Sequence, residues 1–149
     1  ATVDKESHFN VHFYDSYDND IVVSDLKTVQ VELKSKKTDA STKANVAAGK
    51  GSKIKVSYTP QTAGDSELVV LHGGRAVHNA DIDVVPGFAV AKTSQLQADN
   101  LTNAQNGDEI PVRVVLKDAH NNSTTLGERP KVALKMPNRK KPLNVEVHP

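Results

Sequence analysis

The 149-residue sequence predicts an all-β protein built from antiparallel β-sandwich repeats. Three observations predict this fold class. Apolar and polar residues alternate along many short segments, which is the pattern of half-buried strands. Gly, Asn, Asp and Pro separate these segments, as they do in sandwiches. One pair of segments, with the loop that joins them, recurs further along the chain. No segment has the 3.6-residue periodicity that would indicate a helix.

The first five alternating segments predict strands that each place apolar side chains on one face. Their apolar positions are Phe9, Val11 and Phe13; Val29, Val31 and Leu33; Ile54, Val56 and Tyr58; Leu68 and Val70; and Ile82 and Val84. Because each segment has only one apolar face, the segments predict two sheets packed face to face.

The breaks between strands have physical causes. Pro60 cannot donate a hydrogen bond to a central ladder, so the strand before it should end at Tyr58. Gly64 permits the backbone reversal that starts the next strand. The stretch between these residues therefore predicts a corner that crosses from one sheet to the other. Gly73 and Gly74 predict a hairpin turn.

The repeat pairs Asp15 with Asp118 and Asn19 with Asn122, and 118 − 15 gives an offset of 103 residues. The same repeat offset also pairs six apolar positions of the two flanking strands. These pairs are Phe9 and Val112, Val11 and Val114, Phe13 and Leu116, Val29 and Val132, Val31 and Leu134, and Leu33 and Met136.

This repeat predicts one sandwich over residues 1–85, a short linker over 86–93 and a second sandwich over 94–149. We expect the first copy to lack its first strand and the second copy to lack its last strands, as in a piece of a longer repeat array. The first copy should fold, whereas the second should expose unpaired edges.

The composition limits the function classes. The net charge is +1, from 19 basic and 18 acidic residues, which gives no general attraction to nucleic acid or to an anionic membrane. No apolar run approaches the length of a membrane-spanning helix. The absence of cysteine excludes disulfides and thiol chemistry, and it favours a reducing compartment.

The stretch from Tyr58 to Gly87 resembles the second half of a filamin-type immunoglobulin-like repeat. The family pattern of a Tyr-x-Pro corner, a Gly, alternating apolar residues and a final Pro-Gly is present at Tyr58, Pro60, Gly64, Leu68, Val70, Gly74, Val77, Ile82, Val84, Pro86 and Gly87. The "DSYDN" and "DAHNN" loops are similar to the family's Asp-x-x-Gly-Asn segment. The chain departs from the family by having Asp18 and Asn121 in place of the loop glycine.

The resemblance implies a structural and scaffolding rod segment of a filamin-like actin-crosslinking protein. Such a rod spaces actin-binding heads, which would lie outside this chain, and it dimerises and binds partner peptides. The implied location is cytoplasmic, on the actin cytoskeleton. The peptides would add a strand at the edge between the third and fourth strands. Here this implies Val29, Val31 and Leu33, with Thr42, Ala44 and Val46. The opposing interpretation is an ordinary solvated edge protected by lysines.

Other sites in the sequence are weaker. Asp15–Asp20 does not match a calcium loop, because Tyr17 and Leu26 replace required oxygen ligands. The six histidines lack a zinc pattern, and His72 should be partly buried. No catalytic motif is present. We therefore expect no enzyme activity, no cofactor, no metal, no membrane insertion and no nucleic-acid binding, the last despite the basic residues Arg139–Lys141.

Two alternatives stay open. An extracellular adhesion or surface protein would use the glycan acceptor patterns at Asn100, Asn121 and Asn122. A filamin-like module of a ubiquitin ligase would sit beside a catalytic domain elsewhere in the protein.

Overall fold

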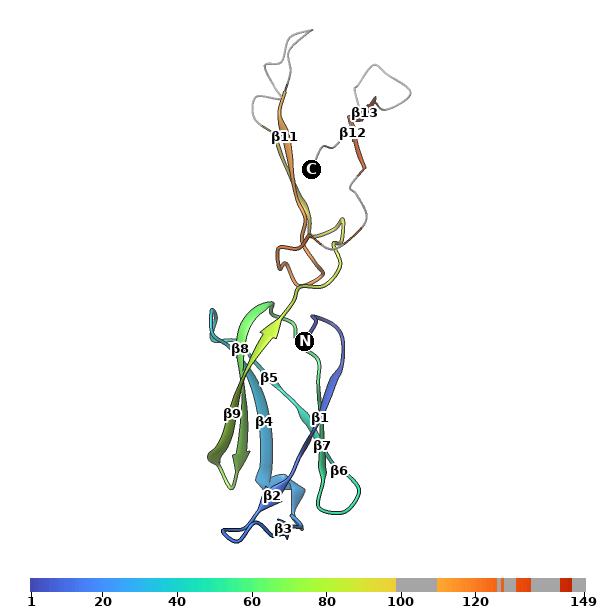
Figure 1. The fold of residues 1–149 in the computed structure, drawn as a ribbon. Helices are drawn as coiled ribbons and strands as arrows, with labels where there is room; N and C mark the ends of the chain where they lie inside the picture. The colour runs from blue at the N-terminus through green and yellow to red at the C-terminus, as the bar shows by residue number, and fades with distance from the viewer. Residues whose placement is uncertain (99–109, 126, 128–130, 135–142, 146–149) are drawn as a thin grey trace. The chain divides into compact units, whose positions relative to one another are not determined.

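The computed structural model describes residues 1–98, 110–125, 127, 131–134 and 143–145. The chain forms two compact units, Ala1–Gly87 and Phe88–Pro149. All its regular elements in the described residues are strands, apart from the 3-10 turn η1 (Leu26–Thr28) (Figure 1). The prediction of an all-β fold with antiparallel sheets is confirmed, whereas the predicted repeat bounds at residues 85, 86–93 and 94 stay a prediction.

The first unit consists of two main sheets. One is three-stranded, and its strands in spatial order are β1 (Ser7–Val11), β7 (Ile54–Tyr58) and β6 (Asn45–Ala48). The other is four-stranded, and its strands in spatial order are β5 (Ser41–Lys43), β4 (Val29–Ser35), β8 (Gly64–His72) and β9 (Arg75–Val84). Every neighbouring pair is antiparallel. A small ribbon joins β2 (Phe13–Tyr14) and β3 (Asp20–Ile21).

The core lies between the two sheets and is aliphatic. The alternation in the sequence predicts its members correctly, since the inward positions of β4, β7 and β8 are buried. The buried core consists of Val3, Val29, Val31, Leu33, Ile54, Val56, Tyr58, Leu68, Val70 and Val84. Half-buried residues of β1 and β9 pack against it, including Phe9, Val11, Ala80 and Ile82.

The predicted corner and hairpin are present. β7 ends at Tyr58 in the three-stranded sheet, and β8 begins at Gly64 in the four-stranded sheet, so the chain crosses between sheets here. Gly64 has a φ of 110°, which favours glycine. Gly73 and Gly74 have φ values of 57° and 80°, as a two-residue hairpin between β8 and β9 requires.

Two predicted strands are interrupted. The first breaks at His12, between β1 and β2. The expected fourth strand, within residues 42–47, is instead two short strands in different sheets. Its first part, β5, pairs with β4, and its second part, β6, pairs with β7. The change occurs at Ala44, whose N–H donates to the carbonyl of Val31 at 2.9 Å.

The beginning of the chain lies parallel to the end of β9. Thr2 and Val85 form a parallel bridge. The amino terminus of Ala1 donates to the Asp83 carbonyl at 2.8 Å. Val85 N–H donates to the Ala1 carbonyl at 2.9 Å, and Val3 N–H donates to the Val85 carbonyl at 3.0 Å. These three bonds close this end of the sandwich over the buried side chain of Val3.

The second unit contains two antiparallel pairs among its described residues. β10 (Gln95–Ala98) pairs with β11 (Val112–Val115), and β12 (Val132–Leu134) pairs with β13 (Leu143–Val145). By the repeat offset, β11 corresponds to β1 and β12 corresponds to β4. Met136, the position that the repeat offset pairs with Leu33, lies outside the described residues.

The repeated loop has the same hydrogen bonds in both units. Asp15 N–H donates to the Asn19 carbonyl at 3.0 Å, and Asp118 N–H donates to the Asn122 carbonyl at 2.9 Å. In each loop the asparagine amide donates to both carboxylate oxygens of the aspartate. The residue before each asparagine, Asp18 or Asn121, has a positive φ of 62° or 70°. The predicted repeat of this loop is therefore confirmed, and Asp15–Asp20 contains an acidic turn.

Candidate partner-binding edge

The edge that the sequence analysis singles out is a groove between β4 and β6 in the first unit. Its volume is about 290 Å³. β5 covers the outer edge of β4 only over Glu32–Lys34, because the chain then leaves for the other sheet. The beginning of β4 and the outer edge of β6 therefore form the two walls of the groove.

The backbone of β4 presents hydrogen-bonding groups to this groove. Ala44 N–H donates to the Val31 carbonyl, and Ser35 N–H donates to the Ala40 carbonyl. In an antiparallel ladder the groups that face one neighbour belong to every second residue. The backbone groups of the odd-numbered residues of β4 therefore face away from β8. Because β5 ends at Lys43, the N–H of Val31 and the C=O of Val29 face the groove.

The same reasoning applies to β6. Gly49 N–H donates to the Lys53 carbonyl, which continues the register between β6 and β7. By the alternation of the ladder, Asn45 and Ala47 bond to β7. The backbone groups of Val46 and Ala48 consequently point to the outer edge of β6. A partner strand would find unpaired donors and acceptors here.

Side chains at this edge have two roles. Val29, Val31 and Leu33 are 3%, 2% and 4% exposed, so their side chains belong to the core rather than to a partner surface. Ala44 and Val46 are half-buried against the same core. Thr42 is half-buried and pairs with Leu33. That these six residues contact a partner stays a prediction. Val29, Val31 and Val46 would contribute their backbone groups to such a contact.

The side chains that line the outside of the groove are polar and were missed by the sequence analysis. They are Gln30, Glu32, Lys43 and Asn45. These residues occupy the polar positions of the same alternating segments, so alternation alone could have found them once outward contacts were sought. They would supply the specificity of strand addition.

The lysines expected to protect this edge are partly engaged elsewhere. Lys34 lies 3.9 Å from Glu32 on the same strand. Lys36 Nζ lies 2.6 Å from Asp81 Oδ1 on β9, at the far edge of the sheet order, and its hydrogen bond to Asp81 raises the Lys36 pKa. The groove is therefore lined by one acidic and one basic side chain, Glu32 and Lys43, with neutral polar neighbours.

The described residues offer no centre for metal chemistry, since no three His, Cys, Asp or Glu side chains gather where they could hold an ion. His72 was expected to be partly buried. This expectation is wrong, because His72 ends β8 beside the hairpin and is exposed, although its ring centroid lies 5.2 Å from that of Phe13. Within the described part of the chain, no helix is long and apolar enough to cross a membrane. Arg139–Lys141 and Asn100 lie outside the described residues.

Comparisons with known proteins include a structural likeness. No family model and no curated protein matches the sequence. The structure is similar to the crystal structure of the Lin-41 filamin domain, with a TM-score of 0.48 and 18% sequence identity. The match covers 58% of this chain and 83% of that chain. It is to a domain of the family that the sequence resembles, and the fold assignment itself rests on the strands described above.

Proposed function

We propose that this chain is a structural and scaffolding segment whose first unit binds partner peptides by strand addition at the edge between β4 and β6. The observation that carries the proposal is the direction of the backbone groups at this edge. Val31 N–H, Val29 C=O and the backbone of Val46 face a groove that β5 leaves uncovered, and Ala48 continues the same outer edge of β6 beyond it. Main-chain bonds would supply affinity, and the outward polar side chains would supply selectivity.

The finer proposal is a rod segment of an actin-crosslinking protein in the cytoplasm. It is supported by the repeat, which places the same strand and the same hydrogen-bonded loop in both units. Serial repetition of one module is how extended spacer proteins are built. Actin binding itself would come from a domain outside this chain.

One contact bears on the extracellular alternative. Asn122 is a glycan acceptor by its sequence pattern, but its Nδ2 donates to both Asp118 carboxylate oxygens at 3.0 and 2.9 Å. A glycan on that nitrogen would compete with these bonds. This favours the intracellular proposal at Asn122.

Strand addition is tested with a matched pair of variants at Ala48. Ala48→Pro removes an N–H that faces the free edge, where proline is tolerated. Ala48→Gly keeps that N–H. Partners captured from a cell extract by the wild-type chain should be retained by the glycine variant and lost with the proline variant. Equal capture by both variants, with unchanged folding by circular dichroism, would contradict strand addition at this edge.

The actin proposal is tested by co-sedimentation of the native full-length protein with filamentous actin. Mass spectrometry of the same preparation shows whether Asn100, Asn121 and Asn122 carry glycans. Pelleting with unmodified asparagines is expected. Glycosylated asparagines without pelleting would instead place the protein outside the cell.

A further inference from the structure

The short strand β5 is held on the edge of β4 mainly by backbone hydrogen bonds. By the alternation of the ladder, Thr42 and Leu33 exchange both of their backbone bonds. The bonds that Ser35 N–H and the Val31 carbonyl make with the chain beside β5 flank this pair. β5 therefore occupies the same backbone groups of β4 that a partner strand would use.

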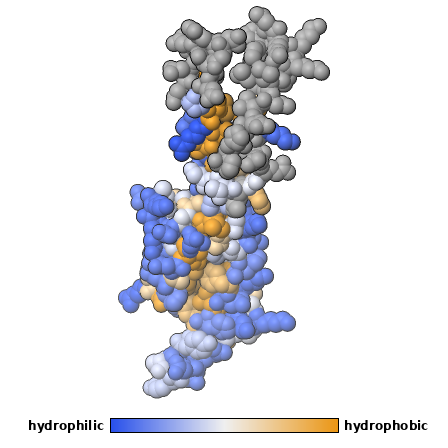
Figure 2. Space-filling model, turned by 45° about the horizontal axis from the view of Figure 1, so that its top comes forward, coloured by the Kyte–Doolittle hydropathy of each residue, from blue (hydrophilic) through white to orange (hydrophobic). Residues whose placement is uncertain are grey.

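The side chains of β5 contribute nothing to the hydrophobic core. Ser41 and Lys43 are exposed, and Thr42 is half-buried. The core and the apolar side chains packed against it include Ala44 and Val46, but no residue of β5. The apolar surface that Figure 2 shows on the first unit therefore comes from other residues. A segment with so few buried apolar contacts opens at a small cost in free energy.

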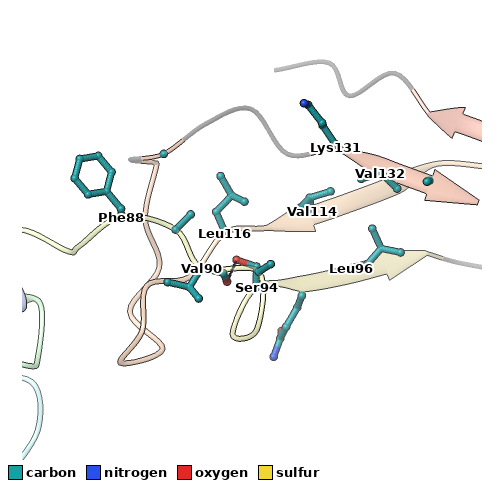
Figure 3. Close-up of a pocket in the computed structure, with 13 residues that line it drawn as sticks. Phe88, Val90, Ser94, Leu96, Val114, Leu116, Lys131 and Val132 are labelled. Atoms are coloured by element: carbon teal, nitrogen blue, oxygen red, sulfur yellow. Dashed lines mark hydrogen bonds between the residues drawn. The ribbon is translucent and has the colours of Figure 1, made fainter.

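The strand β10 of the second unit shows the contrast. It is also short, but its Leu96 lies opposite Val114 on β11. Leu96, Val114 and Leu116 line one cavity of about 750 Å³ (Figure 3). Release of β10 would separate these apolar side chains and expose them to water, which is unfavourable. Release of β5 has no such cost.

The chain is attached to the sandwich on both sides of β5. Lys36 N–H donates to the Asp65 carbonyl at 2.9 Å, and Lys36 Nζ lies 2.6 Å from Asp81 Oδ1. On the other side, Asn45 pairs with β7 in the three-stranded sheet. The segment between these attachments, residues 37–44, can therefore leave β4 while both of its ends stay in place.

We propose that β5 is a displaceable cover of the partner-binding edge, and that a partner strand takes its place along the whole of β4. This inference rests on the proposed function, because it states how strand addition at that edge is regulated. Release of β5 frees backbone groups of Val31, Leu33 and Ser35. A partner that spans β4 regains these bonds and adds bonds to Val29 C=O and Val31 N–H. A partner that covers only the part already paired with β5 gains nothing over it.

The outward side chains of β4 determine the chemistry of that partner. Lys43 lies directly opposite Glu32, and Ser41 lies opposite Lys34. A strand that replaces β5 in the same antiparallel direction places an acidic residue opposite Lys34 and, two residues later, a basic residue opposite Glu32. Directly opposed residues of opposite charge stabilise a strand pair. The partner is therefore an extended peptide in which an acidic residue precedes a basic residue by two positions.

The first test needs no partner. Lys34→Cys with Ser41→Cys allows a disulfide in a chain that has no other cysteine, because Cα atoms of such a non-hydrogen-bonded pair lie about 4.5 Å apart. In the reduced protein, the Leu33 and Ser35 amides should exchange faster than the Glu32 amide, which faces β8. Oxidation should slow the Leu33 and Ser35 amides at least about tenfold, because β5 can no longer open. Exchange of Leu33 as slow as that of Glu32 in the reduced protein would overturn the proposal.

The second test measures replacement of β5 by a fluorescent peptide of residues 38–46 that carries Ser41→Asp. In the full 149-residue chain, Thr42→Pro removes the N–H that bonds to Leu33, whereas Thr42→Val keeps it. The proline variant should bind the peptide at least about tenfold more tightly in fluorescence anisotropy, because its own β5 no longer competes. Equal affinity of the two variants, or no saturable binding by either, contradicts the cover.

The charge order has its own control. A peptide with Ser41→Lys and Lys43→Asp reverses the two charges and should bind the proline variant more weakly. Equal affinity for both peptides would disprove the assigned partner chemistry.

Failure of the cover and failure of the proposed function give different results. If the Thr42 variants bind the peptide equally while the Ala48 variants differ in partner capture, strand addition stands and the cover is wrong. If the Ala48 variants capture partners equally, strand addition at the edge of β6 is wrong, whatever the exchange of Leu33 shows.

Discussion

The Asp15 loop and the Asp118 loop have the same hydrogen bonds but differ in burial. Asp118 is 1% exposed, whereas the Asp15 loop is largely at the surface. In both loops the carboxylate accepts two backbone N–H bonds and the asparagine amide. The bonds within the loop are therefore sufficient for its conformation, and the burial of Asp118 has a separate cause.

The segment from Val90 to Ser94 buries the Asp118 loop. It lies over the Asp118 loop and donates to the carbonyls of Lys117 and Asp118. This loop is therefore a local structure, determined by its own aspartate and asparagine. It becomes buried only where a neighbouring segment covers it.

The largest expected effect comes from removing the buried carboxylate. Asp118→Ala leaves the N–H groups of His120 and Asn122 and the Asn122 amide without their acceptor. The second unit should lose about 2 kcal/mol or more of stability, because bonds to a charged group are strong. Hydrogen exchange of Val112–Val115 measures this loss.

The matched variant is Asp15→Ala, which should cost the first unit less because water can replace the carboxylate there. Hydrogen exchange of the β1 amides measures the loss of stability in the first unit. Equal losses in the two units would show that the cover over the Asp118 loop adds nothing.

A smaller effect is expected from the cover itself. Thr93→Val keeps the shape of the side chain but removes the hydroxyl that donates to Asp118 at 2.7 Å. We expect a loss of about 1 kcal/mol, confined to the second unit. Thr125→Val, at an exposed position, is the control. Hydrogen exchange of the Asn121 and Asn122 amides should be faster in Thr93→Val than in Thr125→Val. Equal exchange in the two variants would show that residues 90–94 do not stabilise the Asp118 loop.

The smallest effect concerns pH. Hydrogen bonds from the Asn19 side chain and backbone and from Tyr17 N–H lower the pKa of Asp15. Because the folded pKa is depressed, this stabilisation is complete above the pKa of the unfolded chain. It is lost as the pH falls through the lowered folded pKa.

The carboxyl signal of Asp15 followed by NMR should therefore titrate below the usual range. Asn19→Ala should raise the Asp15 pKa toward the usual value, since the side-chain bond is the largest cause. Asn122→Ala is the control and should leave Asp15 unchanged. A titration of Asp15 at its usual pKa in the wild-type chain would contradict this assignment.

Much of the fold could be predicted because alternation reports which way a side chain points. The inward residues of β4, β7 and β8 were predicted and are buried. The breaks at Pro60, Gly64 and Gly73 were predictable because each has a backbone cause. The second loop could be predicted by comparing residues at a fixed offset of 103, because an aspartate and an asparagine at the same spacing make the same hydrogen bonds.

Two features could not be predicted from single positions. Residues 41–48 form one alternating segment with no glycine or proline, yet the chain changes sheets at Ala44. Strand addition also depends on where backbone groups point, and that direction follows from the register with neighbouring strands. The resemblance directed the site prediction to this edge, and the residues named on its first strand were the apolar ones, Val29, Val31 and Leu33, whose side chains belong to the core.

The bridge between Thr2 and Val85 has a mechanical consequence. The two segments run parallel, so tension applied at Ala1 and at Gly87 in opposite directions slides one segment along the other. In this geometry the three bonds among Ala1, Val3, Asp83 and Val85 are strained together, rather than opened one after another as at the end of a hairpin. Tension between Ala1 and Gly87 would thus meet a small clamp at this end of the first unit, and the clamp would resist stretching in shear.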